Sequence, residues 1–121
     1  MNYLHTLSET DLTLAQKLKG FVPEQVFDIH VHPYHPGHFA STAFPFLHNA
    51  GVLGCGEHRE AVKRYMPSST VHGLYFGMPH RSAQRDILNQ WVAEEVKTNG
   101  TSISRPLKLV SPQDDVLQTS E

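Results

Sequence analysis

The sequence predicts an α/β fold built on a small parallel β-sheet. Three short runs rich in apolar and β-branched residues, at about 25–32, 70–77 and 105–110, have the composition of strands. Helix-forming stretches at about 9–19, 57–66 and 81–98 precede and separate them. Because strands that alternate with helices pair in parallel through right-handed crossovers, we expect the three strands to share one parallel sheet.

The first helix has a clear beginning and end. Ser8 precedes Asp11 at the spacing of a capping box, and apolar residues follow until Gly20, where a helix would stop. The strand at 25–32 comes next and ends at Pro33, which cannot donate a hydrogen bond to a sheet. The first strand therefore ends where the irregular segment that starts at Pro33 begins.

Residues 33–67 form a long excursion between the first two strands. Prolines and glycines interrupt it up to residue 57, and no helical or strand period is sustained there. Irregular segments of this length are usually functional or disordered, and several phenylalanine and tyrosine residues argue against disorder. Two interpretations remain open: the wall of a substrate pocket, or a loop with its own hydrophobic cluster.

The second half of the chain continues the alternation and then stops early. The strand at 70–77 is almost continuously apolar, which favours a parallel strand covered on both faces. The helix at 81–98 carries an apolar stripe expected to form core: Ile87, Leu88, Trp91, Val92 and Val96. After the third strand, Ser111 and Pro112 begin a helix, yet the sequence ends at Glu121. We therefore expect residues 1–121 to be a single partial domain.

Composition excludes several classes of protein. The net charge of −2 and the absence of a basic cluster argue against nucleic-acid binding. No stretch approaches the roughly 20 apolar residues of a membrane span, and the N-terminus does not resemble a signal peptide. The single cysteine, Cys55, excludes an internal disulfide and fits a reducing cytoplasm, where we expect the protein.

The end of the first strand carries the clearest chemical motif. Asp28, His30 and His32 alternate with single apolar residues and are followed by Pro33. Because residues two apart on a strand point to the same face, we expect the two imidazoles side by side with Asp28 in line behind them. Two imidazoles on one rigid edge are half of a metal site, and this spacing favours that interpretation over a chance pair of histidines.

The run Phe27-Asp28-Ile29-His30-Val31-His32 resembles the first-strand motif of the amidohydrolase superfamily of metal-dependent (β/α)8 barrels. The wider pattern is similar to its amidohydrolase-related branch, which contains the aminocarboxymuconate-semialdehyde decarboxylase-like proteins. The supporting features are the excursion after His-x-His, a second strand ending Phe-Gly-Met-Pro, a helix containing Asn89-Gln-Trp-Val-Ala-Glu, and a third strand running into Val-Ser-Pro-Gln-Asp. The resemblance implies the first three βα units of a TIM-like barrel, incomplete because eight units need about 250 residues.

The resemblance also implies a function and a cofactor. The chain would be the N-terminal part of a hydrolase in which His30 and His32 bind a divalent metal, Zn²⁺ or Mn²⁺. The metal would activate a water for attack on a C–N or ester-like bond of a small-molecule substrate, or the enzyme would catalyse a non-oxidative decarboxylation. Asp28 would orient the strand or a ligand. The catalytic base is expected beyond residue 121, so these 121 residues alone are expected to be inactive.

Other polar residues lie nearer the expected rim of such a barrel. His35, His38, His80 and Arg81 are candidates for contact with substrate, against the alternative of solvated loop residues. His72 lies near the start of the second strand, at the wrong end of a barrel to bind the metal. Cys55 has no visible acid–base partner and is expected to be a loop thiol and not a nucleophile.

Three alternatives remain beside the leading interpretation. Phosphoesterases of the polymerase-and-histidinol-phosphatase type and TatD-like nucleases also open a barrel with His-x-His, and a non-catalytic binding protein could retain only this part of the fold. An incomplete sheet leaves bare edges and apolar faces. We therefore expect either a homo-oligomer or a requirement for the missing C-terminal part of the barrel.

Overall fold

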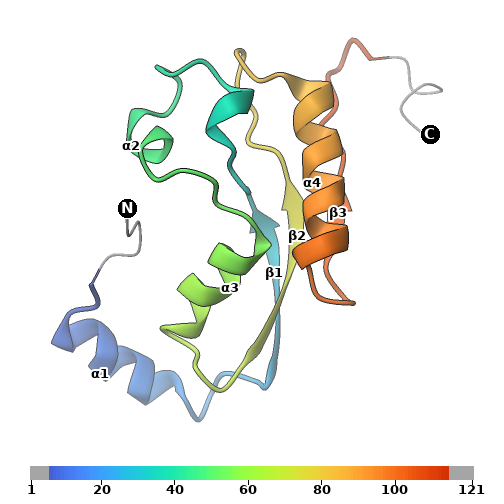
Figure 1. Cartoon of the computed structure of the whole chain (residues 1–121). Helices are drawn as coiled ribbons and strands as arrows, with labels where there is room; N and C mark the ends of the chain where they lie inside the picture. The colour runs from blue at the N-terminus through green and yellow to red at the C-terminus, as the bar shows by residue number, and fades with distance from the viewer. Residues whose placement is uncertain (1–5, 115–121) are drawn as a thin grey trace.

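The computed structural model describes residues 6–114, and it has the predicted α/β architecture (Figure 1). Strands β1 (Gln25–Val31), β2 (Thr70–Phe76) and β3 (Arg105–Leu107) form one sheet in that order, and both neighbouring pairs are parallel. The prediction of a small parallel sheet is therefore confirmed.

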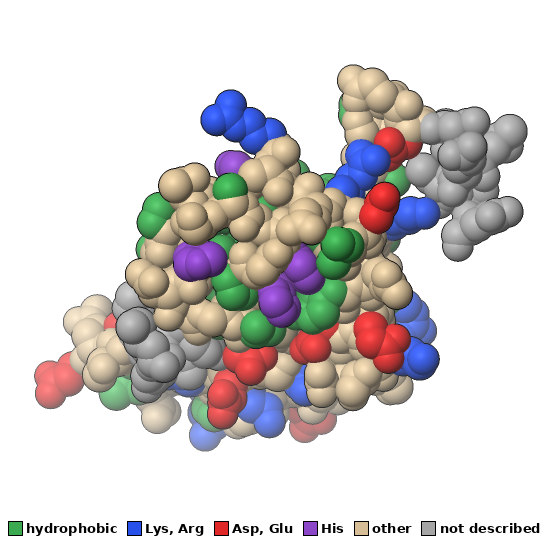
Figure 2. Space-filling view, turned by 45° about the horizontal axis from the view of Figure 1, so that its top comes forward, with side chains coloured by type: hydrophobic (Ala, Val, Ile, Leu, Met, Phe, Trp, Pro, Cys, Tyr) green, Lys and Arg blue, Asp and Glu red, His purple; other side chains and the backbone are tan. Residues whose placement is uncertain are grey.

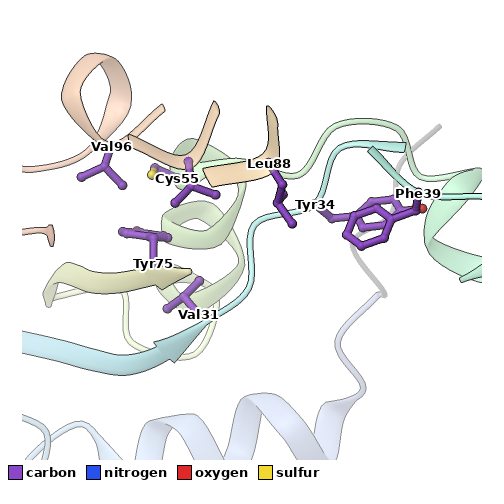
Figure 3. Packing of buried hydrophobic residues seen from close by; sticks show 8 residues of the cluster. Val31, Tyr34, Phe39, Cys55, Tyr75, Leu88 and Val96 are labelled. Carbon is purple, nitrogen blue, oxygen red and sulfur yellow. The ribbon is translucent and has the colours of Figure 1, made fainter. Parts of the chain in front are cut away.

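The helices α3 (Cys55–Lys63) and α4 (Arg85–Asn99) cover one face of the sheet (Figure 1). Between the sheet and these helices lies the hydrophobic core, which Figure 3 shows from close by. Its buried members come from β1, the excursion, α3, β2 and α4: Val31, Tyr34, Phe39, Cys55, Tyr75, Leu88, Val92 and Val96. Trp91 packs against this cluster as predicted, but Ile87, expected in the same stripe, is exposed.

The opposite face of the sheet has no covering layer among the described residues. Ile29 is 72% exposed, and Phe27 and Leu107 also leave much of their surface in contact with solvent. β1 therefore keeps one face open to solvent, since covering this face requires a second layer. In β2, the strand expected to be covered on both faces, Val71, His72, Gly73 and Tyr75 are buried.

Helix α1 (Glu9–Leu18) begins with the predicted capping box, in which Ser8 and Asp11 exchange hydrogen bonds between side chain and backbone. None of its residues is buried, and Leu12 and Leu14 are about half exposed. The helix lies beyond the N-terminal ends of β1 and β2, away from the core (Figure 1). Across residues 6–114, no helix is long and apolar enough to cross a membrane.

The excursion at 33–67 is more ordered than the sequence indicated. It contains the short helices η1 (Pro36–His38) and α2 (Pro45–His48), and an antiparallel bridge joins Tyr34 to Leu53. Tyr34 and Phe39 stack on each other with ring centroids 5.3 Å apart and belong to the main core. The segment therefore folds onto the domain and is not a separate cluster.

Several predicted boundaries differ from the observed ones. Helix α3 begins at Cys55, with Gly54 as the N-cap residue, and α4 begins at Arg85 after a turn. The third strand ends at Leu107, three residues earlier than predicted. The helix predicted after Ser111 lies mostly outside the described residues, and its first part, up to Asp114, is a turn.

The pairing of β1 with β2 contains one irregularity that controls the site. Asp28 pairs with Gly73, but Val31 pairs with Tyr75, so β1 holds one extra residue between these two positions. Such a β-bulge reverses the alternation of side chains beyond it. Val31 consequently faces the helices with Tyr75, and its neighbours point to the uncovered face of the sheet.

Candidate metal-binding site

His30 and His32 come together at the C-terminal end of β1, as predicted. Their Nε2 atoms are 3.0 Å apart, and the two rings meet edge to face with centroids 4.9 Å apart. Phe76, at the end of β2, contacts both rings, with centroid distances of 5.1 Å to His30 and 4.5 Å to His32. The pair is open to solvent on one side, because His30 is exposed and His32 half-buried. Figure 2, which turns the upper end of Figure 1 toward the viewer, shows that histidine side chains lie among hydrophobic ones on this side of the molecule.

The hydrogen bond made by Nδ1 of His32 selects the tautomer of the neutral ring. Its Nδ1 lies 3.1 Å from the carbonyl oxygen of Phe76, and a carbonyl only accepts, so Nδ1 carries the proton. The Nε2 atom of His32 is therefore an acceptor with a free lone pair. This is the arrangement that orients an imidazole as a metal ligand.

His30 takes the complementary form in the metal-free pair. Because His32 Nε2 accepts, His30 Nε2 donates across the 3.0 Å that separates them. For both nitrogens to face a metal, the proton of His30 must leave Nε2, either to solvent or to Nδ1. Metal binding is therefore expected to change the tautomer of His30 and to leave that of His32 unchanged.

The spacing of the two nitrogens fits a shared ligand position. With Zn–N bonds of about 2.0–2.1 Å, nitrogens 3.0 Å apart subtend an angle of about 94° at the metal. A tetrahedral angle would need the nitrogens about 0.3 Å further apart, which a small ring rotation supplies. Two donor positions therefore suit a divalent metal such as zinc, and manganese also accepts imidazole.

The described residues supply two donors and not a complete site. No group of three or more His, Cys, Asp or Glu side chains capable of holding a metal occurs within residues 6–114. A catalytic zinc ordinarily has three protein ligands and a water. A complete zinc site of this kind would therefore need at least one protein donor beside the two imidazoles.

Asp28 does not lie in line behind the two histidines, so that expectation is wrong. Its Oδ2 atom lies 3.1 Å from Nε2 of His58 in α3, on the helical side of the sheet, while Oδ1 accepts a 3.1 Å hydrogen bond from the backbone N–H of His30. The bulge is the reason, because it breaks the alternation between Asp28 and His30. Asp28 thus contacts the strand and α3 and is not directed at the histidine pair.

His58 is a polar residue that sequence reasoning missed. It is mostly buried, and besides Asp28 it contacts the hydroxyl of Tyr75, whose oxygen lies 2.9 Å from Nδ1. Burial of this hydroxyl raises the pKa of Tyr75. In the sequence His58 lies within the stretch predicted as a helix, and only its position opposite Asp28, 30 residues away, gives it significance.

The predicted substrate-contact residues of the excursion lie apart from the histidine pair. His35 and His38 stack on each other at 4.4 Å, and both rings contact Trp91 of α4. His38 is buried, its Nδ1 has no partner among the described residues, and burial together with the nearby His35 lowers its pKa. These contacts give the two histidines a packing role, and their contact with substrate stays a prediction.

His80 and Arg81 line a depression of about 470 Å³ beyond the end of β2, together with Arg85 and Ser111. The rings of His80 and Phe44 are in contact, with centroids 5.1 Å apart. The Nδ1 atom of His80 accepts a hydrogen bond from the backbone N–H of Ser82 and lies 2.8 Å from the Ser82 hydroxyl oxygen. Arg85 is paired with Asp114 at 2.8 Å. His80 and Arg81 therefore lie beyond the C-terminal end of β2, and their contact with substrate stays a prediction.

His72 and Cys55, to which the sequence analysis gave no part in the site, both lie in packed surroundings. His72 bonds Gln25 and Thr101, each at 2.6 Å, near the start of the sheet and away from the histidine pair. Cys55 is not in a loop but is the first residue of α3 and fully buried, which corrects its predicted placement. Burial and the nearby Glu95 raise the pKa of the Cys55 thiol to about 11, so it stays protonated.

Comparison with known proteins adds no assignment: no family model, curated protein or solved structure matches this chain. The function must therefore be argued from the geometry of the site and from the resemblance of its motif.

Proposed function

We propose that this chain is the N-terminal part of a metal-dependent hydrolase of the amidohydrolase-related family, comprising the first three βα units of a (β/α)8 barrel. The observation that carries the proposal is the convergence of the His30 and His32 Nε2 atoms to 3.0 Å at the C-terminal end of a parallel strand. In barrels of this kind the active site lies at that end of the strands.

The two faces of the sheet support the same proposal. Helices α3 and α4 cover one face, as the outer helices of a barrel do, and apolar side chains such as Ile29 and Leu107 remain bare on the other. His30 and His32 point to this second face with Phe76 beneath them. In a closed barrel, that face would be the interior.

Each residue has a defined part in the proposed chemistry. His30 and His32 would hold a divalent metal, Zn²⁺ or Mn²⁺, with His32 oriented by the Phe76 carbonyl. When bound, such a metal supplies an acidified water or polarises a carbonyl, for hydrolysis of a C–N or ester-like bond or for decarboxylation. His80 and Arg81 would meet a small-molecule substrate at the rim. A catalytic base and further donors would come from outside the described residues, so the chain alone is not expected to turn over substrate.

Metal titration tests the proposal directly. Isothermal titration with Zn²⁺ and Mn²⁺ should give one site per chain, and His30→Ala or His32→Ala should weaken the affinity tenfold or more. His48→Ala, which removes a histidine of the excursion outside the pair, is the matched control and should bind like the wild type. The proposal is wrong if the wild type binds no tighter than the His30→Ala/His32→Ala double variant. Binding that survives without hydrolase activity in any assembly would instead favour the non-catalytic alternative.

A further inference from the structure

A hydrogen-bonded chain on the helical side of the sheet runs from Tyr75 through His58 and Asp28 to the backbone N–H of His30. The acceptor is the carboxylate of Asp28, so His58 Nε2, 3.1 Å away, carries a proton and donates it. His58 Nδ1 is then an acceptor, and the hydroxyl of Tyr75 donates to it across 2.9 Å. The order is therefore Tyr75 to His58 to Asp28, with every donor and acceptor matched.

Asp28 passes this constraint on to the strand. Its second oxygen accepts from the backbone N–H of His30 at 3.1 Å. This N–H lies within the bulge, where the regular ladder between β1 and β2 is interrupted. One oxygen of the Asp28 carboxylate thus accepts from the backbone at the interruption of the ladder, while the other contacts His58 of α3.

The direction of the His30 side chain depends on the bulge. Without the extra residue, the strand beyond Asp28 would alternate in the opposite sense, and His30 and His32 would share the helical face with Asp28. The 3.0 Å approach of the two imidazoles on the other face therefore requires the bulge to stay in its present position.

We infer that His58, fixed by Tyr75 and acting through Asp28, is a positioning residue that holds the bulge and so aims His30 at His32. This inference rests on the proposed function for its consequence, which is tighter metal binding, but the geometry it asserts can be measured separately. Removal of groups that orient metal ligands typically weakens affinity 10- to 100-fold.

The chain offers a matched control in His72. It is also a mostly buried histidine with two hydrogen bonds, to Gln25 and Thr101, but it lies near the other end of the sheet. A purely structural effect of losing a buried imidazole should be similar in His58→Leu and His72→Leu. An effect on the bulge should appear only in the first.

The test uses the full chain, with Zn²⁺ as the probe, and two readouts. We expect His58→Leu to weaken Zn²⁺ binding about tenfold and to speed hydrogen exchange at the His30 amide, while His72→Leu leaves both close to wild type. Tyr75→Phe, which keeps the ring and removes the hydroxyl, should give a smaller shift in the same direction. His58→Gln, which keeps an amide donor toward Asp28, should restore part of the His30 protection and serves if the leucine variant fails to fold.

The outcomes separate the two ideas. Unchanged protection of the His30 amide in His58→Leu, or equal loss in His72→Leu, would overturn the inference. If the wild type binds no Zn²⁺, the proposed function fails, and the exchange measurement still decides whether His58 holds the bulge. Loss of protection with unchanged Zn²⁺ affinity would show that the bulge does not aim His30, and would also overturn it.

Discussion

Replacing Gly73 by alanine should destabilise the protein, because the added methyl group has no room. A Cβ at this position would lie 2.6 Å from the Cε2 and Cζ atoms of Tyr75 and 2.9 Å from its hydroxyl oxygen. The Tyr75 side chain has no exposed surface and belongs to the core. The ring therefore cannot move away without disturbing its neighbours and its hydrogen bond to His58.

Two opposing terms set the size of the effect. Forcing an extra methyl into a packed core costs about 1–3 kcal/mol. Exchanging glycine for alanine recovers about 0.4–1 kcal/mol through the unfolded chain, since Gly73 does not have a positive φ. The packing cost exceeds this gain, so the net loss in the free energy of unfolding is about 1–2 kcal/mol. For a chain of this length that corresponds to a fall in Tm of about 4–8 °C.

Chemical denaturation followed by circular dichroism, at one fixed protein concentration, measures the change. Gly56→Ala is the matched control, because nothing lies within 4 Å of a Cβ built there and the residue is inside α3. Helix propensity predicts that this control gains up to about 1 kcal/mol. The reasoning would be refuted if Gly73→Ala were as stable as Gly56→Ala.

Three further predictions concern other parts of the fold. Because Cys55 is buried and its thiol pKa is raised to about 11, iodoacetamide should label it at pH 8 far more slowly in the native protein than in guanidinium; equally fast labelling would contradict this. Burial lowers the pKa of His38 below 6.5, so the unfolded state binds more protons near that pH and stability should fall as the pH drops. His38→Phe should flatten the dependence of the denaturation midpoint between pH 5 and 8, and an unchanged slope would count against it. Ile29→Glu should reduce self-association in sedimentation velocity, because Ile29 is 72% exposed on the bare face; an unaltered distribution would place the contact elsewhere.

The sequence predicted the elements well where local chemistry controls them. The Ser8 capping box, the apolar run of β2 and the stripe of α4 each identified an element, because caps and periodicity depend on neighbours in the chain. The start of α4 was predicted four residues early. Ser82 looked like a helix start, but its hydroxyl and its backbone N–H contact His80 instead.

The candidate site was predicted only in its local part. The His-x-His spacing brought His30 and His32 together, since residues two apart share a face beyond the bulge. The bulge itself depends on how β1 registers against β2, about 45 residues later, and no local pattern reports that register. The partnership of Asp28 with His58 followed from the same long-range pairing and was therefore invisible in the sequence.

The excursion between β1 and β2 also bears on how the protein folds. Residues 25 and 70 must meet before the sheet can form, and closing a loop of about 45 residues costs about 3 kcal/mol in (3/2)RT ln n. The logarithm is shallow, so halving the loop would recover only about 0.6 kcal/mol. The length of this segment therefore has little effect on the entropic cost of forming the sheet. Residues can therefore be inserted into or removed from its exposed parts at little entropic cost to the sheet that carries His30 and His32.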